Sequence, residues 1–564
     1  MKKIIYTFAL LLCSVLGFAQ NIVTITDADL GNGTYNWTND NTYLLDGFVY
    51  VEAGGVLNIE AGTVIKGKAS PTDGNLASAL IITRGAKINA NGNAAQPIIF
   101  TAETDDISNI SDLGLNNRGL WGGLIMLGNA PVAEDGGSDF IEGLPSTETR
   151  AYYGGDNPAD NSGTLTYVSI RHGGAELEPD VEINGLTLGG VGSGTTIDYL
   201  EVVSNLDDGI ELFGGKVNIK HAAVAYCGDE CFDYDEGWSG NGQFWFGMVG
   251  FDKGDQPGEH DGSEATPGST YDFPSFPHIY NATYIGPGDT AVSVKCPAVM
   301  TIKARGAGIY ANSIFTDFAK AGLQIEDKPA ADGDDSYGYF LRDSIQILNS
   351  IWYAAGWNSV DDIVKVAADA EHAGASELKA SFSGAWANEI GNPGLNNIDH
   401  GSYQFLTEIL GNGNLDPRPQ SNSIAYQNLA SYDGLDGFFT EVSYKGAFGE
   451  ENWMLGWTAL DAYGFLDQTS GIENVALAVN TLQVFPNPTT ASQINVTIDS
   501  PETFNATIAI YNELGQKLNM EVPVKINTGN NTISLPLSTL PQGIYQLIIT
   551  NEKGATAATS FILE

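Results

Sequence analysis

The chain has 564 residues, of which 69 are Asp or Glu and 25 are Lys or Arg, so its formal net charge at pH 7 is −44. A surface this acidic repels phosphates and anionic membranes, which excludes nucleic acid as an expected partner. Apolar residues make up 43% and aromatic residues 10% of the chain, too many for a disordered acidic chain. The composition instead suits a soluble protein that binds divalent cations or neutral glycans.

Residues 1–19 have the organisation of a secretory signal peptide. A basic start and an apolar stretch lead to a small-x-small sequence, which predicts cleavage between Ala19 and Gln20. A lipoprotein anchored through Cys13 is the alternative, but leucines stand before this cysteine where lipid attachment needs a small residue. No later segment reaches ~18 apolar residues, so we expect no transmembrane segment in the mature chain.

Three cysteines remain after the predicted cleavage. Cys227 and Cys231 could close a small disulfide loop in an oxidising compartment, which would leave Cys296 unpaired. A zinc site is not expected, because no second Cys/His pair has ligand spacing.

An internal repeat is the most informative feature of the chain. Residues 196–215 align with the segment 22 residues later, with apolar positions on apolar positions and acidic ones on acidic ones. The paired positions are Ile197 with Ile219, Leu200 with Ala222, Val202 with Val224, Asp207 with Asp229, Asp208 with Glu230, Ile210 with Phe232, Glu211 with Asp233 and Leu212 with Tyr234. A second alignment, at a shift of 23, places Gly62 on Gly85 and Ile65 on Ile88.

This repeat predicts the fold class. Short alternating strands that are broken by Gly, Asn and Asp and recur every 22 to 24 residues indicate a solenoid of β-strands. Three strands plus turns fill one such coil, so we predict an all-β fold, a right-handed parallel β-helix, over residues 20–466. An asparagine precedes several of the later strands, at Asn281, Asn312 and Asn349. The leucine-rich signature is missing, and a β-propeller would need a period of ~40 residues.

Some segments do not follow the repeat. Residues 252–278 are rich in Gly, Pro and Asp and are predicted to form a long loop. Residues 358–380 carry helical spacing after a capping signal at Ser359 and predict a helix that packs against the coils. Because the ends of a solenoid must be covered, we expect residues 21–50 and 438–466 to cap them.

The composition changes after residue 466. Residues 467–480 are predicted to be a linker. Residues 481–564 contain about seven alternating strands and indicate a small immunoglobulin-like β-sandwich. The sequence therefore predicts two independent cores.

The acidic positions of the repeat pose a physical problem. Glu211 alternates with Ile210 and Leu212, so the apolar pair faces the core and the glutamate points outward. In a parallel coil, residues one repeat apart stack at ~4.8 Å, where like charges repel by ~3 kcal/mol at an effective dielectric constant of ~20. The stacked pairs therefore need a counter-charge, raised pKa values or full exposure to solvent.

Three interpretations of these positions stay open: solvated acidic turns, a Ca²⁺ site, or a catalytic group. A Ca²⁺ site is plausible chemically because hard carboxylate ligands can converge from adjacent coils without His or Cys. The candidate metal ligands are Asp207, Asp208, Glu211, Asp229, Glu230 and Asp233, with Asp235 and Glu236 able to complete the set. The catalytic alternative combines Asp207 and Asp208 with an acid or base. Arg171 and His172, which end the strand one coil earlier, are the candidates for that role.

Two other groups of residues have structural explanations. Glu259-His260-Asp261 lies in the predicted loop and is expected to serve local turns rather than a metal. A sugar-stacking platform is one interpretation of the central tryptophans, but buried packing is the favoured one. These tryptophans are Trp238, Trp245, Trp352 and Trp357.

The C-terminal segment resembles the type A sorting domain of the type IX secretion system of Bacteroidetes. The motifs stand in family order and at family spacing over residues 481–564. They include Phe485, Pro486, Asn487, Pro488, Gly515, Gly543 and Tyr545. The resemblance implies passage through the type IX secretion machinery, removal of the domain, and release or attachment at the cell surface.

Residues 50–466 are similar to a group of secreted Bacteroidetes β-helix proteins, through stretches such as LWGGLIMLGNAPV, DDGIELFGG and WMLGWTALDAYGFL. This resemblance implies fold and location and transfers no catalytic residue. DDGIEL is also similar to the paired-aspartate motif of polygalacturonases, but the NTD, GHG and RIK elements of that family are absent in recognisable order.

These observations predict an exported cell-surface or extracellular scaffold that is stabilised by Ca²⁺ and binds glycans or neighbouring cells in adhesion. The alternative, from a different class, is a polysaccharide-cleaving lyase or hydrolase. An enzyme needs a cleft that gathers Arg171, His172 and the aspartates, whereas a scaffold needs only exposed loops and aromatic patches.

Overall fold

The computed structural model describes most of the chain in two parts. The first part comprises residues 21–177, 181–291, 294–329, 334–366, 371–404 and 407–467. The second comprises residues 479, 481–490, 492–501, 503–512, 517–537, 540–551 and 556–563. The predicted signal peptide with its cleavage site, most of the predicted linker, and Gly515 lie outside the described residues. The chain divides into two compact units, Met1–Asp467 and Gln468–Glu564.

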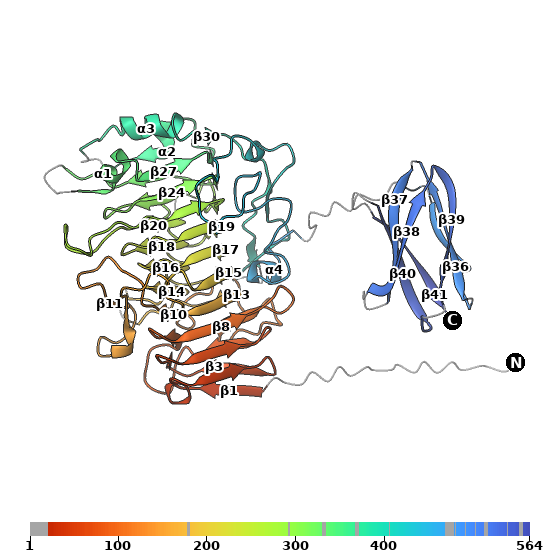
Figure 1. Cartoon of the computed structure of the whole chain (residues 1–564), viewed down its shortest axis with the longest axis horizontal. Coiled ribbons are helices and arrows are strands. Elements are labelled where there is room, and N and C mark those ends of the chain that lie inside the picture. The colour runs from red at the N-terminus through yellow and green to blue at the C-terminus, as the bar shows by residue number, and fades with distance from the viewer. Residues whose placement is uncertain are drawn as a thin grey trace. The chain divides into compact units, whose positions relative to one another are not determined.

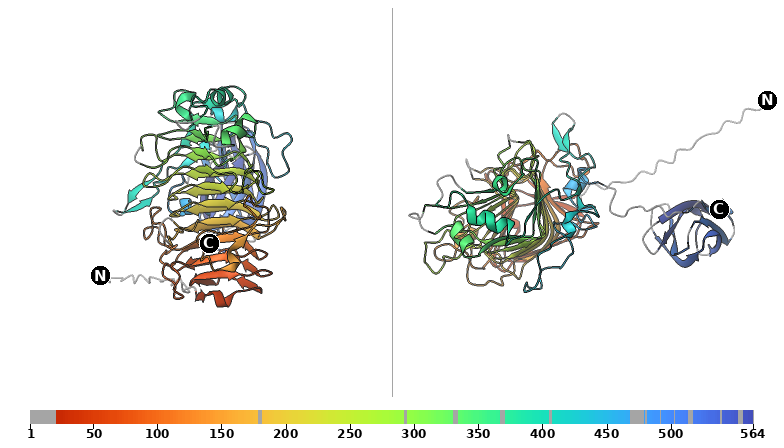
Figure 2. Two further views of the ribbon diagram at one scale, coloured as in Figure 1. Left: turned by 90° about the vertical axis from the view of Figure 1, so that its left-hand side faces the viewer. Right: turned by 90° about the horizontal axis from the view of Figure 1, so that it is seen from above.

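The first unit is a parallel β-helix, which confirms the predicted architecture (Figure 1). One wall is a ten-stranded parallel sheet whose strands follow each other in chain order. Its strands are β4 (Phe48–Val51), β7 (Ala79–Ile82), β10 (Leu124–Leu127), β14 (Leu186–Gly189), β16 (Ile210–Phe213), β18 (Phe232–Asp235), β20 (Gly258–His260), β23 (Met300–Ile302), β26 (Leu323–Ile325) and β29 (Val364–Lys365). Seen along the stack, the strands of successive coils superpose (Figure 2).

The rest of each coil belongs to an eighteen-stranded sheet. Between the two ends of the stack, each coil supplies it with one long strand or with two short ones. The long strands are β13 (Gly163–Arg171), β15 (Thr196–Val203), β17 (Asn218–Ala225) and β19 (Asn241–Met248). The short strands are β1 (Asn21–Ile25), β2 (Thr34–Trp37), β3 (Asn41–Leu45), β5 (Val56–Ile59), β6 (Val64–Gly67), β8 (Lys87–Asn91), β9 (Ile98–Ala102), β21 (His278–Tyr280), β22 (Thr283–Ile285), β24 (Gly308–Ala311), β25 (Ile314–Thr316), β27 (Ile345–Leu348), β28 (Ile351–Tyr353) and β30 (Glu389–Ile390).

The register of the central coils is the one that the 22-residue repeat predicts. Ile197 pairs with Ile219 between β15 and β17, and Glu211 pairs with Asp233 between β16 and β18. Ile210 is fully buried, as its inward assignment requires. The repeat alignment therefore identified true coil neighbours.

The second alignment, near the N-terminus, is wrong. Ile88 pairs with Leu57 between β5 and β8, and Ile65 pairs with Phe100 between β6 and β9. The two aligned stretches share a glycine turn but stand at different sides of the coil. Their true shifts are longer because residues 68–78 add a loop between β6 and β7.

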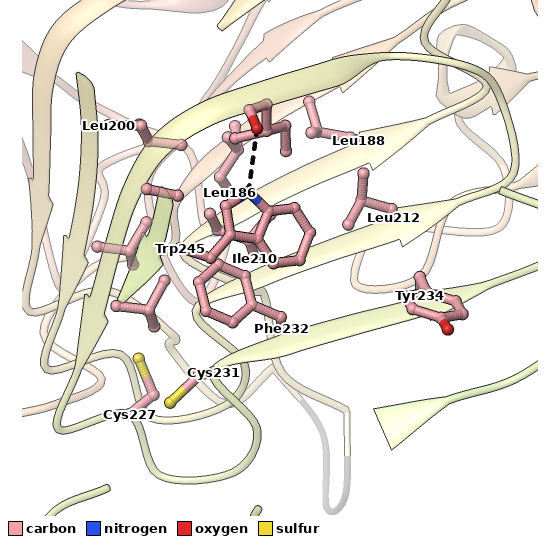
Figure 3. Close-up of a cluster of buried hydrophobic side chains, with 14 of the residues drawn as sticks. Leu186, Leu188, Leu200, Ile210, Leu212, Cys227, Cys231, Phe232, Tyr234 and Trp245 are labelled. Carbon is pink, nitrogen blue, oxygen red and sulfur yellow. Dashed lines mark hydrogen bonds between the residues drawn. The ribbon is translucent and has the colours of Figure 1, made fainter. Parts of the chain in front are cut away.

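Inward side chains of the coils form one continuous apolar core. Figure 3 shows its centre, where Leu186, Ile210 and Phe232 come from three successive strands of the ten-stranded sheet. Trp245 fills the space opposite them, and its indole nitrogen donates a hydrogen bond to the Ile219 carbonyl at 3.0 Å. The stacking of large apolar side chains at repeat-related positions explains why this sequence closes into coils.

A bend divides the strands of the eighteen-stranded sheet, and in the central and later coils one residue at the bend has a left-handed backbone. In the central coils these residues are aromatic, and their rings stack in a column: the centroids of Tyr167 and Tyr199, and of Tyr199 and His221, lie 4.3 Å apart. Later coils place asparagine there, at Asn281, Asn312 and Asn349. Asparagine adopts left-handed φ at low cost, which explains the asparagines before the later strands.

Residues 391–467, which we call the strap, run back along the bends instead of adding coils. The strap contains β31 (Leu395–Asn397), β32 (Ser402–Gln404), β33 (Glu408–Leu410), β34 (Asp416–Pro419) and the helix α4 (Ala459–Ala462). The asparagine column holds it: Asn312 exchanges two hydrogen bonds with the Ala430 backbone, at 2.7 and 3.2 Å. Near the strap's end, Glu201 accepts hydrogen bonds from the Ala459 and Leu460 amides at 2.6 and 3.1 Å.

Three sequence expectations need correction. Residues 438–466 belong to the strap and lie along the coils, and residues 21–50 form β1 to β4, so neither segment is a separate end cap. The expected long helix is two short ones, α2 (Val360–Ile363) and α3 (Ser376–Ser383), because β29 adds a last strand between them. Residues 252–278 are not all loop, because β20 pairs with β18 and β23.

The stack ends beneath α3, which Figure 1 shows at the top of the β-helix. Leu378 and Phe382 of α3 are buried against the core, as is Trp386 after it. The remaining short elements lie outside the coils: η1 (Asp27–Asp29), β11 (Asp139–Phe140), η2 (Thr149–Ala151), β12 (Tyr152–Tyr153), α1 (Ser336–Leu341) and η4 (Ile424–Tyr426). Within the described part of the chain, no helix has the length and apolar character needed to cross a membrane.

The second unit is the predicted β-sandwich of seven strands. One antiparallel sheet contains β35 (Thr481–Phe485), β36 (Gln493–Ser500) and β39 (Gly529–Pro536). The other contains β37 (Phe504–Asn512), β38 (Lys517–Ile526), β40 (Gly543–Asn551) and β41 (Thr556–Leu563). Residues of both sheets share one apolar core, so this unit has a core of its own.

Candidate metal centre

The outward face of the ten-stranded sheet carries a row of acidic side chains. Thr187, Glu211, Asp233, Glu259 and Thr301 stand in register on β14, β16, β18, β20 and β23. Three consecutive positions of this row are therefore carboxylates on neighbouring parallel strands. The corners before β16, β18 and β20 add further acids.

Asp208, Glu211 and Asp233 form the first carboxylate triad. Each offers one carboxylate oxygen, and these oxygens all lie within 4.8 Å of one another. Asp208 is 5% exposed and accepts a hydrogen bond from the Glu230 amide at 2.8 Å. A buried oxygen of Asp233, Oδ1, has no hydrogen-bond partner. Three oxygen ligands thus converge, one of them with unused acceptor capacity.

Asn184 adds a neutral oxygen beside this triad. Its side-chain amide donates a hydrogen bond to Glu211, and the residue is only 5% exposed. The amide oxygen of Asn184 is buried without a partner. A buried carbonyl-type oxygen that lacks a donor costs free energy unless a ligand satisfies it, and Ca²⁺ accepts such an oxygen.

Burial and mutual repulsion dominate the electrostatics of the first triad. Burial, followed by the charges of Glu230 and Asp233, holds the pKa of Asp208 well above its usual range. Burial likewise raises the pKa of Glu211 and Asp233 well above normal, and neighbouring carboxylates add to the effect. Among the described residues, no lysine or arginine forms an ion pair with any of the three. The described part of the chain therefore supplies no cationic partner to this triad, and its carboxylates have raised pKa values instead.

Asp229, Glu230 and Asp255 form a second carboxylate triad. Unlike the first triad, it has a lysine that offsets the repulsion between its carboxylates. Lys295 lies between its carboxylates, 3.3 Å from Asp229 and in direct contact with Asp255. This triad therefore has a counter-charge from the chain itself. The next carboxylate of the outward row, Glu259, is also paired, with Lys303 at 2.7 Å.

The six predicted ligands are thus divided between two places. Asp208, Glu211 and Asp233 belong to the first triad, whereas Asp229 and Glu230 belong to the second. Asp207 is in neither set; burial and the charge of Asp229 raise its pKa to about 7. Of the two residues suggested to complete the site, Glu236 accepts a hydrogen bond from the Tyr153 hydroxyl, and Asp235 is half-buried.

The structure does not assemble the catalytic alternative. Arg171 and His172 are buried beneath the strap: Arg171 donates to Ser169 at 2.8 Å, and His172 contacts the Tyr463 hydroxyl at 3.0 Å. Asp208 instead belongs to the first triad. These hydrogen bonds are therefore structural, within β13 for Arg171 and to the strap for His172.

The remaining candidates are core residues. Trp238, Trp245 and Trp352 are fully buried, and Trp357 is 6% exposed, so packing and not a sugar platform explains them. His260 points inward and stacks on Tyr234 with centroids 4.1 Å apart. The tripeptide Glu259-His260-Asp261 is thus part of a coil, and not of a turn in a long loop.

Cys227, Cys231 and Cys296 are free thiols in the structure, which differs from the predicted Cys227–Cys231 bridge. All three are buried, and Figure 3 shows Cys227 and Cys231 turned into the core. Burial raises the pKa of Cys227 to about 12. A disulfide forms through the thiolate, so this environment disfavours oxidation.

Asn184 and Lys295 are the important residues that sequence reasoning missed. Leu186 pairs with Ile210, so Asn184 occupies the position that Asp208 occupies one coil later. Extending the repeat alignment by one coil toward the N-terminus would have identified Asn184. Lys295 lies outside any coil strand, and nothing in its local sequence marks it as a counter-ion.

Comparison with known families agrees with both units. Residues 30–392 match the family described as pectate-lyase like beta helix domain, and residues 483–564 match the secretion system C-terminal sorting domain. The first match covers more than half of the chain, so the chain belongs to the pectate-lyase-like β-helix family. It is an exported β-helix protein that the type IX secretion system delivers to the cell surface or the extracellular space.

No curated protein sequence matches the chain. Among solved structures, one match is the enzymatically active domain of tailspike protein 4 of bacteriophage CBA120, with 10% sequence identity and a TM-score of 0.18. The match covers 93% of this chain and 62% of that chain. A TM-score this low carries no argument about fold or function.

The sorting motifs occupy structural positions in the sandwich. Asn487 exchanges hydrogen bonds with the backbone of β41, at 3.0 Å to the Ser560 carbonyl and 2.9 Å from the Ile562 amide. Tyr545 is buried, and its hydroxyl donates to the Pro541 carbonyl at 2.5 Å. Both motif residues therefore hold segments of the sandwich together.

Proposed function

We propose that the protein is an extracellular or cell-surface scaffold whose β-helix is stabilised by Ca²⁺ at the first carboxylate triad. The observation that carries this proposal is the set of Asp208, Glu211 and Asp233, whose oxygens converge without a cationic partner among the described residues. The unpartnered oxygens of Asp233 and Asn184 support it independently. Ca²⁺ takes six to eight oxygen ligands, so water would complete the shell.

The surface role is binding of glycans or neighbouring cells in adhesion. The high negative charge, the secretion tail and the long solenoid support a scaffold that displays loops outside the cell. The buried contacts of Arg171 and His172 favour this role over the alternative, a polysaccharide-cleaving enzyme. Residues engaged in these contacts are not available to act as the acid or base beside the aspartates.

Thermal melting with and without Ca²⁺ tests the metal site. Ca²⁺ at about 100 times its Kd should stabilise the fold by ~2.7 kcal/mol, and excess EDTA should reverse the effect. The Asp208→Asn/Asp233→Asn variant should lose most of this gain. In EDTA it should melt no lower than the wild type, because the substitution also removes repulsion.

The second triad supplies the matched control. Asp229→Asn/Asp255→Asn breaks ion pairs with Lys295, so it should lower the melting temperature while it leaves the Ca²⁺ response intact. An equal loss of the Ca²⁺ response in both double variants would show diffuse charge screening and not a site. If the wild type released reducing sugar from a polysaccharide and Asp208→Asn abolished that release, the result would favour the enzyme over the scaffold.

A further inference from the structure

A pocket lies on the β-helix far along the chain from the carboxylate triads. Its volume is about 330 Å³, and its polar lining includes Asn32, Glu52, Thr83, Arg84, Arg150 and Tyr152. The first coils contribute the acidic and amide groups, and the short hairpin of β11 and β12 contributes the tyrosine. The volume is at the lower end of the range of about 300–1,000 Å³ for small-molecule pockets.

Arg150 is a fixed wall of this pocket. Its guanidinium donates to Glu148 at 2.7 Å, to Asp27 at 3.0 Å and to Glu52 at 3.1 Å, and it lies 3.8 Å from the centroid of the Tyr50 ring. Three carboxylates and an aromatic face therefore hold one arginine. This network sets the position of the Glu52 carboxylate.

Arg84 has spare hydrogen-bonding capacity. Its Nη1 donates to the Gly154 carbonyl at 2.9 Å and lies 3.4 Å from the Ser138 hydroxyl. Among the described residues it forms no ion pair with a carboxylate. A guanidinium has five N–H donors, so several remain for a ligand in the pocket.

Tyr152 supplies an accessible ring. It is 43% exposed, and the ring of Phe140 packs edge-on against it with centroids 5.4 Å apart. The phenylalanine supports the tyrosine from the hairpin and leaves part of the ring open to the pocket. An exposed aromatic ring that neighbouring residues hold in place offers a flat apolar surface beside polar groups.

The chemistry of this lining selects a neutral polyol. Adjacent hydroxyls can donate to the Glu52 carboxylate and accept from the Arg84 guanidinium, and the apolar face of a sugar ring can stack on Tyr152. The two guanidinium groups are outnumbered by the carboxylates of Asp27, Glu52 and Glu148. An acidic sugar would therefore meet net repulsion, which the whole acidic surface would increase.

We propose that this pocket binds a neutral sugar unit of a glycan, with Tyr152 as the stacking platform and with Arg84 and Glu52 as the hydroxyl ligands. The inference rests on the proposed function, because it gives the scaffold a binding site and a ligand class. It is independent of the metal, since the pocket includes no residue of either carboxylate triad.

Titration calorimetry on the mature protein tests the pocket. The probes are cellohexaose, xylohexaose, mannohexaose and maltohexaose, with hexagalacturonate as the acidic comparison. At least one neutral hexasaccharide should bind, and Tyr152→Ala should weaken its affinity at least about tenfold, a loss of about 1.4 kcal/mol. Arg84→Lys, which keeps the charge but loses the planar fork, should weaken it by a similar factor.

Tyr353→Ala is the matched control, because Tyr353 is 38% exposed on β28, in a late coil. It should leave the affinity unchanged, and the melting temperature of each variant checks its folding. The proposal is overturned if no neutral probe binds at millimolar concentration, if hexagalacturonate binds more tightly, or if both pocket variants retain full affinity. Measurements in Ca²⁺ and in EDTA separate the two proposals, because sugar binding without a Ca²⁺ effect on melting would contradict only the metal site.

Discussion

Glu211 shows how a single outward position can become a buried charge. The alternation of Ile210, Glu211 and Leu212 predicts its direction correctly, but not its environment. Two stretches outside the coil strands, one with Leu144 before β13 and one with Ile183 after it, pack on the same face of the ten-stranded sheet. The carboxylate therefore lies at the edge of an apolar cover, and no local pattern in the sequence predicts that cover.

Inward positions are the simplest to test at this scale. Ile210→Asp would place a carboxylate without a partner in the apolar core, at a cost of at least about 3 kcal/mol, and should lower the melting temperature strongly. Thr196→Asp, on an exposed position of the same coil, should change stability by no more than about 0.5 kcal/mol. Similar melting of the two variants would refute the inward assignment.

The buried carboxylates also predict a dependence on pH. Burial raises the pKa of Glu230 to about 9 and of Glu236 and Asp261 to about 8. Because these pKa values exceed those of the unfolded chain, the protonated groups stabilise the fold at low pH, and this contribution is lost as the pH rises through 8 and 9. In EDTA the melting temperature should therefore fall between pH 7 and pH 9.

Ca²⁺ should oppose this fall, since the metal replaces protons at the first triad. The Ca²⁺-dependent gain in melting temperature should grow with pH over the same interval. Glu236→Gln, which removes one titrating group outside the triad, should flatten the curve in EDTA without changing the Ca²⁺ response. A melting temperature that rises with pH in EDTA is the outcome that the structure does not allow.

At the scale of elements, the repeat predicts the strand register correctly where successive coils have equal length. It predicts the wrong register where an insertion lengthens a coil. The 22-residue shift is correct for β15 to β18, because no insertion separates these strands. Between Ile65 and Ile88 the same method failed, because similar glycine turns occur at different sides of a coil. Periodicity identifies a solenoid, but turn motifs alone do not set its register.

The strap is the element that sequence reasoning placed wrongly. Its aromatic composition signals burial, but burial against an end and burial against a side look alike in sequence. The sequence pattern identifies the asparagines before the later strands, but it does not identify the residues that they bind. In the structure the asparagines bind the strap across 79 to 163 residues of sequence, as Asn312 does with Ala430.

Substitution of Asn312 tests this attachment. Asn312→Gly removes both hydrogen bonds to Ala430 while it tolerates the left-handed φ, and should cost about 1–3 kcal/mol. Asn312→Ala should cost about 1 kcal/mol more, because alanine adds strain at φ 52°. Hydrogen exchange at the Ala430 amide should speed up in both variants. Unchanged exchange there would mean that the strap is held elsewhere.

At the scale of the whole chain, the two units have separate cores and separate tasks. The β-helix and the sorting domain could both be predicted from sequence, because a long repeat and three ordered motifs are strong signals. The carboxylate triads could be predicted only in part, because Asp255 and Lys295 approach through loops without a repeat register.

Deletion of residues 481–564 tests the division of labour. The truncated protein should fold with a β-sheet spectrum and the melting temperature of the full chain's β-helix, because the main core contains no residue of the second unit. It should accumulate in the periplasm, since the secretion system no longer recognises it. Normal display of the truncated protein at the cell surface would refute the role of the sorting domain.

The most direct test of the central claim is titration calorimetry of Ca²⁺ into the metal-free mature protein. The proposed metal site predicts saturable binding that Asp208→Asn/Asp233→Asn abolishes and that Asp229→Asn/Asp255→Asn leaves in place. The absence of saturable Ca²⁺ binding to the wild type, together with a melting temperature that EDTA does not change, would contradict it.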